Sequence, residues 1–182
     1  MNRQLFFRPH AHPIETRALP QLTDDDSGRR LVRATGDLSA VRGALEDAVA
    51  VAEGDGAADP AELALLLHHL GCVLHDVGAA AEARSCLERA LHIHEALCGS
   101  GHSAVARDLR ALSQLLLEAG ELTTARRSCE RALAIDRAAF GGGHQVVATD
   151  LLRLAHILWD MDDRYGADWC FTSAQDIQAA TA

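Results

Sequence analysis

Apolar residues recur at steps of three and four positions through most of the chain, and short polar or glycine-containing breaks separate the runs. One run extends from Leu63 to Leu74, and a second extends from Ala83 to Leu97 after a break at Gly78. This spacing places apolar side chains on one face of an α-helix. The pattern therefore predicts pairs of antiparallel helices joined by short turns.

The same order of helix, break and helix follows twice more, and individual residues return every 42 positions. The recurring groups are Gly101-His102 with Gly143-His144, Val105-Ala106 with Val147-Ala148, Asp108-Leu109 with Asp150-Leu151, Leu112 with Leu154, and Glu88–Leu91 with Glu130–Leu133. A fixed period of roughly 20 to 50 residues is typical of stacked arrays, because each unit buries its apolar face against its neighbours. We therefore expect an all-α solenoid with no sheet.

The period divides the chain into three parts. Residues 1–21 contain three prolines at non-helical spacing and are expected to be extended or flexible. Residues 22–56 are expected to form a degenerate capping hairpin with a short first helix, since terminal repeats are commonly atypical. The rest of the chain, residues 57–182, is expected to form three full hairpins, with bounds at 57–98, 99–140 and 141–182.

A cluster of Leu5, Phe6 and Phe7 in the N-terminal segment has no repeat to join. One hypothesis is that this segment lies in the groove of its own chain, or of a neighbouring copy, as a built-in ligand. The alternative is a flexible tail, which is common at chain ends.

Composition narrows the classes of function. All 17 basic residues are arginine and the net charge is −9, so a concentrated basic surface for nucleic acid is not expected. The five cysteines form no CxxC pair, and no stretch has the form of a signal peptide or a membrane span. These features favour a reducing cytoplasm and no membrane partner. The absence of lysine and the single asparagine, Asn2, favour a GC-rich bacterial genome.

The hairpins resemble the tetratricopeptide repeat (TPR). That motif has a large residue, then Leu-Gly and another large residue on helix A, a turn glycine, and two alanines around an aromatic residue on helix B. The first full unit has Leu67, Leu70-Gly71, Leu74, Gly78, Ala83, Leu87 and Ala90; the second has Leu109, Leu112-Ser113, Leu116, Gly120, Ala125, Cys129 and Ala132; the third has Leu151, Leu154-Ala155, Leu158, Asp162, Ala167, Phe171 and Ala174. The small residues would let the helices of a hairpin approach closely.

The 42-residue period and the linker from Phe140 to Leu151 are similar to the longer subtype found in kinesin light chain and in many bacterial regulators. The chain departs from the family at several aromatic positions and lacks a proline at the end of helix B. The resemblance implies a right-handed superhelix of three full repeats plus a degenerate N-terminal one. It also implies a scaffold or peptide-binding protein, such as an accessory or regulatory subunit of a bacterial system.

The resemblance further assigns a binding surface, because the A helices of TPR arrays line the concave face, where a partner protein or peptide binds. The corresponding positions are Leu65, His68, Cys72, His75, Arg107, Arg110, Gln114, Leu117, Thr149, Leu152, His156 and Trp159. Arginine and histidine in this row favour an acidic ligand, with Trp159 and Arg110 as the expected anchors. The alternative is that the arginines are solvated or paired with acidic residues of the chain itself.

A second hypothesis is a sensor that binds a metal or another small ligand. His68, Cys72 and His75 fall on one helical stripe, where two imidazoles and a thiolate could bind zinc or copper. The alternative is that the histidines form the groove wall and Cys72 packs between hairpins. His92 and His94 are two positions apart on a helix and are expected at the surface.

A third hypothesis, an enzyme, has the least support. The chain contains neither a GxSxG motif nor a phosphate-binding loop of the GxxxxGK[ST] type. We therefore expect no catalytic residues and no cofactor. Self-association through the terminal repeats or the N-terminal segment is a further expectation.

Overall fold

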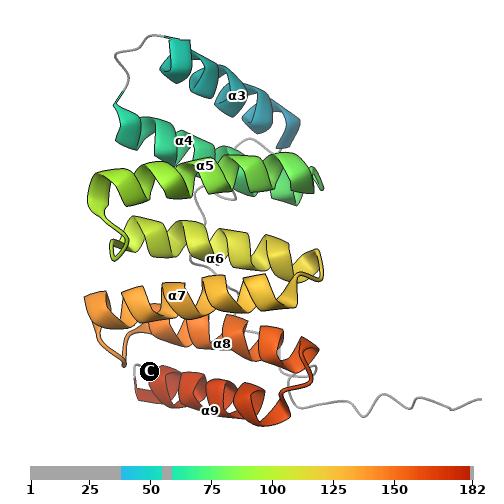
Figure 1. Ribbon diagram of the computed structural model, residues 1–182, viewed down its shortest axis with the longest axis vertical. Coiled ribbons are helices and arrows are strands. Elements are labelled where there is room, and N and C mark those ends of the chain that lie inside the picture. The colour runs from blue at the N-terminus through green and yellow to red at the C-terminus, as the bar shows by residue number, and fades with distance from the viewer. Residues whose placement is uncertain (1–37, 55–58, 181–182) are drawn as a thin grey trace, which may run out of the picture.

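The computed structural model describes residues 38–54 and 59–180, and within these residues it contains seven α-helices and no strand (Figure 1). The helices are α3 (Leu38–Gly54), α4 (Pro60–Asp76), α5 (Ala80–Cys98), α6 (Ser103–Glu118), α7 (Leu122–Phe140), α8 (Gln145–Asp160) and α9 (Arg164–Ala180). The predicted all-α repeat fold is confirmed. The cluster Leu5–Phe7 and the expected first helix of the capping unit lie outside the described residues.

Successive helices pair into hairpins that stack in chain order (Figure 1). The hairpins are α4 with α5, α6 with α7, and α8 with α9, and each packs on the next through α5 against α6 and α7 against α8. The first helices of neighbouring hairpins also contact each other directly, α4 with α6 and α6 with α8. Helix α3 packs against α4 and covers the start of the stack.

Glycine and histidine define the linkers between hairpins. Gly99 and Gly141 follow α5 and α7 with φ values of 82° and 84°, a left-handed conformation that glycine adopts without strain. Three residues later, Nδ1 of His102 and of His144 accepts a hydrogen bond from a backbone N–H in the first turn of α6 or α8, at 3.2 Å in both cases. The imidazole therefore caps the helix that it precedes.

The interior of each hairpin is filled by small residues where its helices cross. The alanines at these crossings are all fully buried: Ala83, Ala90, Ala125, Ala132, Ala167 and Ala174. A Cβ atom added to Gly71 would lie 2.7 Å from Cγ of Leu87, so α4 and α5 approach closely there. The close approach expected from the small residues is confirmed.

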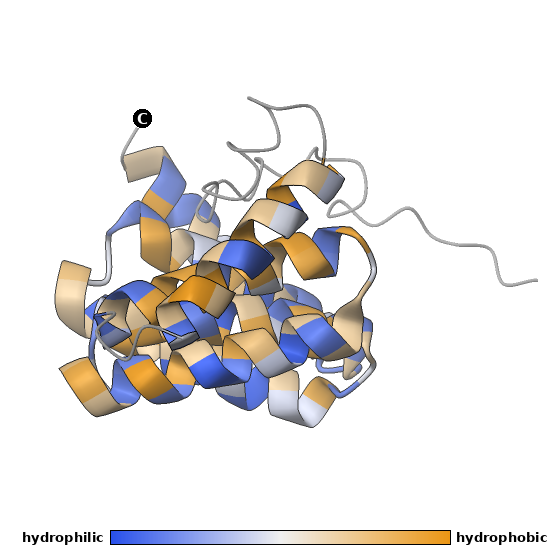
Figure 2. Ribbon diagram, turned by 90° about the horizontal axis from the view of Figure 1, so that it is seen from above, coloured by the Kyte–Doolittle hydropathy of each residue, from blue (hydrophilic) through white to orange (hydrophobic). Residues whose placement is uncertain are grey.

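The helices are amphipathic. Figure 2 shows hydrophobic and hydrophilic segments alternating along them, and Leu67, Leu87, Leu151 and Ile157 are among the most deeply buried large side chains.

No helix in the described part of the chain is both long and apolar enough to cross a bilayer.

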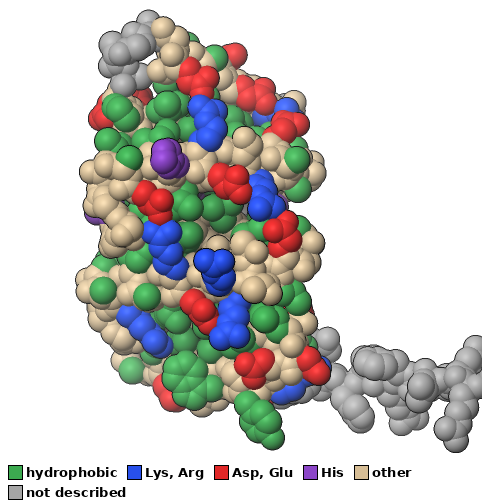
Figure 3. Space-filling model, viewed as in Figure 1, with side chains coloured by type: hydrophobic (Ala, Val, Ile, Leu, Met, Phe, Trp, Pro, Cys, Tyr) green, Lys and Arg blue, Asp and Glu red, His purple; other side chains and the backbone are tan. Residues whose placement is uncertain are grey.

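Ion pairs connect neighbouring hairpins along the outer face of the second helices. Arg42 of α3 lies 3.2 Å from Glu82 of α5, and Arg84 of α5 lies 2.6 Å from Glu121 ahead of α7. Further pairs are Arg89 with Glu53 and Arg131 with Glu95. Figure 3 shows basic and acidic side chains interleaved over this face. Exposed pairs of this kind contribute little stability individually. Together they connect the outer surfaces of successive hairpins.

We predict that Ala132→Leu destabilises the protein by about 1–3 kcal/mol, because the added atoms overpack the crossing of α6 and α7. Urea unfolding followed by circular dichroism measures the effect. Ala134→Leu is the matched control, since Ala134 is exposed on the same helix. Equal unfolding midpoints for the two variants would contradict the assigned packing.

Candidate functional site

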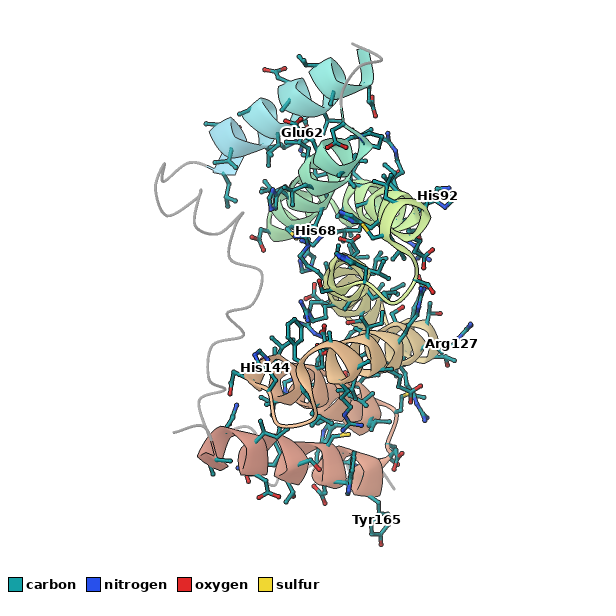
Figure 4. The ribbon with its side chains drawn as sticks, turned by 90° about the vertical axis from the view of Figure 1, so that its left-hand side faces the viewer. Glu62, His68, His92, Arg127, His144 and Tyr165 are labelled. Atoms are coloured by element: carbon teal, nitrogen blue, oxygen red, sulfur yellow. The ribbon has the colours of Figure 1, made fainter. Side chains whose placement is uncertain are left out.

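The twelve predicted binding residues lie on α4, α6 and α8, the first helices of the three hairpins. Nine of them keep at least partial exposure and form what we call the A-helix row: Leu65, Cys72, His75, Arg107, Arg110, Gln114, Leu117, His156 and Trp159. Figure 4 shows that His92 and Arg127, from second helices, project from the opposite side of the stack. The A-helix row is therefore a surface separate from the ion-paired outer face.

His68, Thr149 and Leu152 are buried, with 0%, 9% and 6% of their surface exposed. The expectation that these three residues face a ligand is corrected, since they belong to the interior. The reason is the direct packing of α4 on α6 and of α6 on α8, which covers side chains in the middle of each first helix. Helical spacing within one segment does not reveal this depth.

His68 belongs to a buried polar cluster between the first and second hairpins. Its Nδ1 lies 2.7 Å from Oδ1 of Asp108, and Nδ1 of His94 lies 2.6 Å from the other oxygen, Oδ2. One carboxylate on α6 thus joins imidazoles from α4 and α5. The surface position expected for His94 is wrong, because His94 is only 5% exposed, whereas His92 is exposed as expected.

A second buried cluster lies between the second and third hairpins. Nη1 of Arg110 lies 2.5 Å from Oδ2 of Asp136 and 3.8 Å from Oδ1 of Asp150. Both carboxylates are fully buried and share this guanidinium. Burial raises the pKa of Asp150 to about 7; Arg110 opposes the rise, and the neighbouring Asp136 adds to it. Arg110 is thus occupied by acidic residues of its own chain, the alternative noted above for the arginines.

The two clusters occupy equivalent positions in successive repeats. The triad of His68, His94 and Asp108 returns 42 residues later as Arg110, Asp136 and Asp150. Four of these residues were not among the candidates from the sequence: His94, Asp108, Asp136 and Asp150. Ionisable residues at all three positions in two successive units were a signal that could have identified them.

Hydrogen bonds join the A-helix row across the three hairpins. Nε2 of His75 lies 2.6 Å from Oε2 of Glu118. Nε2 of Gln114 donates to Oε1 of Glu118 at 2.7 Å, and Nη1 of Arg153 donates to Oε1 of Gln114 at 2.9 Å. Burial favours a higher pKa for Glu118, but the bonds from Gln114 and His75 outweigh it and lower that pKa. This series of hydrogen bonds holds the side chains in the middle of the row in place.

Comparison with protein families identifies the repeat. Residues 62–128 match the family model of the tetratricopeptide repeat. Residues 62–128, about a third of the chain, are thus similar to the tetratricopeptide repeat. Among curated proteins no significant sequence match is found.

Similar solved structures share the fold of most of the chain. BtubC (BKLC) from P. vanneervenii is 20% identical with a TM-score of 0.77, over 84% of this chain and 61% of its own. A putative kinesin light chain from Podosopora anserina, with nearly identical TPR-like repeats, is 20% identical with a TM-score of 0.68, over 96% and 80%. A variant form of that protein has a TM-score of 0.70 at 20% identity, over 97% and 80%. This chain thus spans less than two thirds of the length of BtubC, and these similarities show the fold.

The structure does not bring together the three residues of the metal hypothesis. His68 faces Asp108 through Nδ1, and His75 contacts Glu118. Sγ of Cys72 lies 3.6 Å from Nε2 of His68. In the described residues no group of three or more His, Cys, Asp or Glu side chains is placed to hold a metal ion. Binding at His68, Cys72 and His75 would require these contacts to break.

Arg107 and Trp159 differ from the rest of the row in what their side chains contact. Arg107 is partly buried, and its Nε is buried without a hydrogen bond to any described residue. Trp159 is partly exposed, with the guanidinium of Arg164 3.8 Å from the centre of its ring. A buried donor without an acceptor favours an anionic group, and the tryptophan supplies apolar area.

We predict that the free energy of unfolding falls as the pH rises through about 7, because Asp150 holds its proton in the folded state to a pH far above its ordinary value of 3.8. This contribution is complete below the ordinary pKa and is lost as Asp150 ionises. Asp150→Asn, which mimics the protonated form, should remove about 4 kcal/mol of the decline between about pH 4 and pH 8.

Urea unfolding at a series of pH values measures this decline. Asp160→Asn is the matched control, since Asp160 is exposed on the same helix. Parallel pH curves for wild type and Asp150→Asn would contradict the assignment of Asp150 as the titrating group.

Proposed function

We propose that this chain is a protein-interaction module that binds an acidic segment of a partner protein along the A-helix row. Tetratricopeptide repeats in general mediate contacts between proteins, and a family model of this repeat matches residues 62–128. The observation that carries the acidic character of the partner is the partly buried guanidinium of Arg107, whose Nε has no acceptor among the described residues. A carboxylate from a partner would satisfy that donor.

The surroundings of Arg107 support a peptide as the bound form. Leu65 occupies the equivalent position on the preceding first helix and is 38% exposed. Leu117 and Trp159 provide further apolar surface at the equivalent positions near the other end of α6 and α8. An extended segment with an acidic residue and apolar neighbours would contact this row over three hairpins.

The hydrogen bonds in the middle of the row limit which of its residues can contribute binding energy. His75 and Gln114 already bond to Glu118 and Arg153, so they orient the surface and offer few free donors. Arg110, the other expected anchor, is held by Asp136. We therefore assign the main contributions to Arg107 and Trp159.

The composition supports a bacterial cytoplasmic setting for this module, and the resemblance supports an accessory or regulatory role. The partner can be identified by affinity purification with three forms of the chain as bait, followed by quantitative mass spectrometry. A true partner is retained by wild type and by Glu130→Ala on the outer face, and is lost with Arg107→Ala combined with Trp159→Ala. A partner lost only with Glu130→Ala would move the binding surface to the outer face.

We predict that Arg107→Ala and Trp159→Ala each weaken partner binding by about 2 kcal/mol, roughly thirty-fold, because anchors of this type dominate desolvated interfaces. Titration calorimetry with the purified partner measures the change, and Arg89→Ala on the outer face should be nearly silent. Arg110→Ala is not a suitable probe. It would remove the guanidinium that pairs with the buried Asp136 and lies near Asp150, and destabilise the fold by about 3–5 kcal/mol.

A further inference from the structure

Helix α9 exposes two aromatic side chains at one end of the stack. Tyr165 is 91% exposed and Trp169 is 59% exposed. They are four residues apart, so they lie one turn apart on the same helical face. Figure 4 shows Tyr165 projecting outward from the last helix.

The fold does not require aromatic residues at these positions. Tyr165 corresponds to Thr123 and Ala81 in the preceding repeats, and Trp169 corresponds to Arg127 and Ser85. Small or hydrophilic residues thus serve the same structural role twice in this chain. The two aromatic side chains are therefore available for a contact outside the hairpin, and large aromatic residues are typical anchors of protein interfaces.

The series of ion pairs between hairpins on the outer face does not continue to α9. Arg89 and Arg131 each pair with a glutamate of the preceding repeat, but the next residue in this series is Ser173. Arg137 takes the place of those glutamates and has no ion pair with any residue that the structure describes. Its guanidinium is near α9, where its charge lowers the pKa of Cys170 against the larger effect of burial.

Charge at this end of the array is nearly balanced, although the whole chain has a net charge of −9. Helices α7 and α9 together contain five arginines and four acidic residues. Asp168 and Asp176 are exposed on α9 without an ion pair to the described residues. The surface therefore offers unpaired groups of both signs beside exposed aromatic side chains, which is the composition of a self-complementary interface.

We propose that the outer face of α9, with the adjoining edge of α7, binds a second copy of this chain in a two-fold symmetric dimer. Tyr165 and Trp169 of the two copies pack against each other, and Arg137 of each copy lies opposite Asp168 or Asp176 of its partner. Two-fold symmetry forms every such contact twice.

The available area is sufficient for a dimer of moderate strength. A 17-residue helix is about 25 Å long, and with the edge of α7 it offers a face about 20 Å wide. This gives about 500 Å² for each copy, or about 1,000 Å² in total, which is the lower bound for a specific interface. We therefore expect a reversible dimer with a micromolar dissociation constant.

Sedimentation velocity of the full chain over a range of micromolar concentrations tests the proposal. Wild type should sediment with a mass that rises to twice that of one chain. The decisive variant combines Tyr165→Thr with Trp169→Arg, because these are the residues that the second repeat has at the same positions. It should keep the wild-type circular dichroism and raise the dissociation constant by at least about ten-fold.

Leu97→Ala is the matched control, since Leu97 is 47% exposed on α5 and should leave the dimer unchanged. Arg137→Glu should also weaken association, because it makes the face acidic on both copies. A wild-type chain that stays monomeric at every concentration would overturn the proposal and leave the aromatic pair for a different protein. A dimer that survives the double substitution would place the interface elsewhere and equally overturn it.

Discussion

A two-helix hairpin cannot cover its own apolar face, so each unit of this chain depends on its neighbours for a core. The small residues at the crossings follow from this constraint, because Gly71 and Ala132 let paired helices approach closely enough to leave no gap. The contact of α4 with α6 and of α6 with α8 follows as well. Stacking therefore also decides which side chains of the first helices remain available to a partner.

The fold could be predicted from the sequence because its information is local. The spacing of apolar residues, the 42-residue period and the small residues at fixed offsets each act within one hairpin or its nearest neighbour. The site was less predictable because burial depends on contacts between separate helices. The spacing along the helix places His68 on the same stripe as Cys72 and His75. Only the packing of α6 against α4 shows that His68 is buried and contacts Asp108. His94 was misplaced for the same reason.

The two buried ionic clusters differ in a way that gives each junction its own chemistry. Ion networks in the interior seldom add much stability compared with apolar packing, but removing one member is strongly destabilising. We interpret the clusters as determinants of neighbour choice. A hairpin that carried Arg110 and Asp136 against Asp108 would bury a different charge from one that carried His68 and His94.

The histidine caps distinguish the linkers between hairpins from the turns within them. Turns within a hairpin are closed by backbone hydrogen bonds, such as Ala79 N–H to the carbonyl of Leu74 at 2.8 Å and Glu121 N–H to that of Leu116 at 2.9 Å. Linkers between hairpins have backbone hydrogen bonds as well, such as His102 N–H to the carbonyl of Gly99 at 3.2 Å, and they add a side-chain acceptor, Nδ1 of His102 or His144. Replacing either histidine would therefore remove the cap of one first helix without touching the backbone hydrogen bonds that close the turns inside the hairpins, so a linker can be altered separately from the hairpins that it joins.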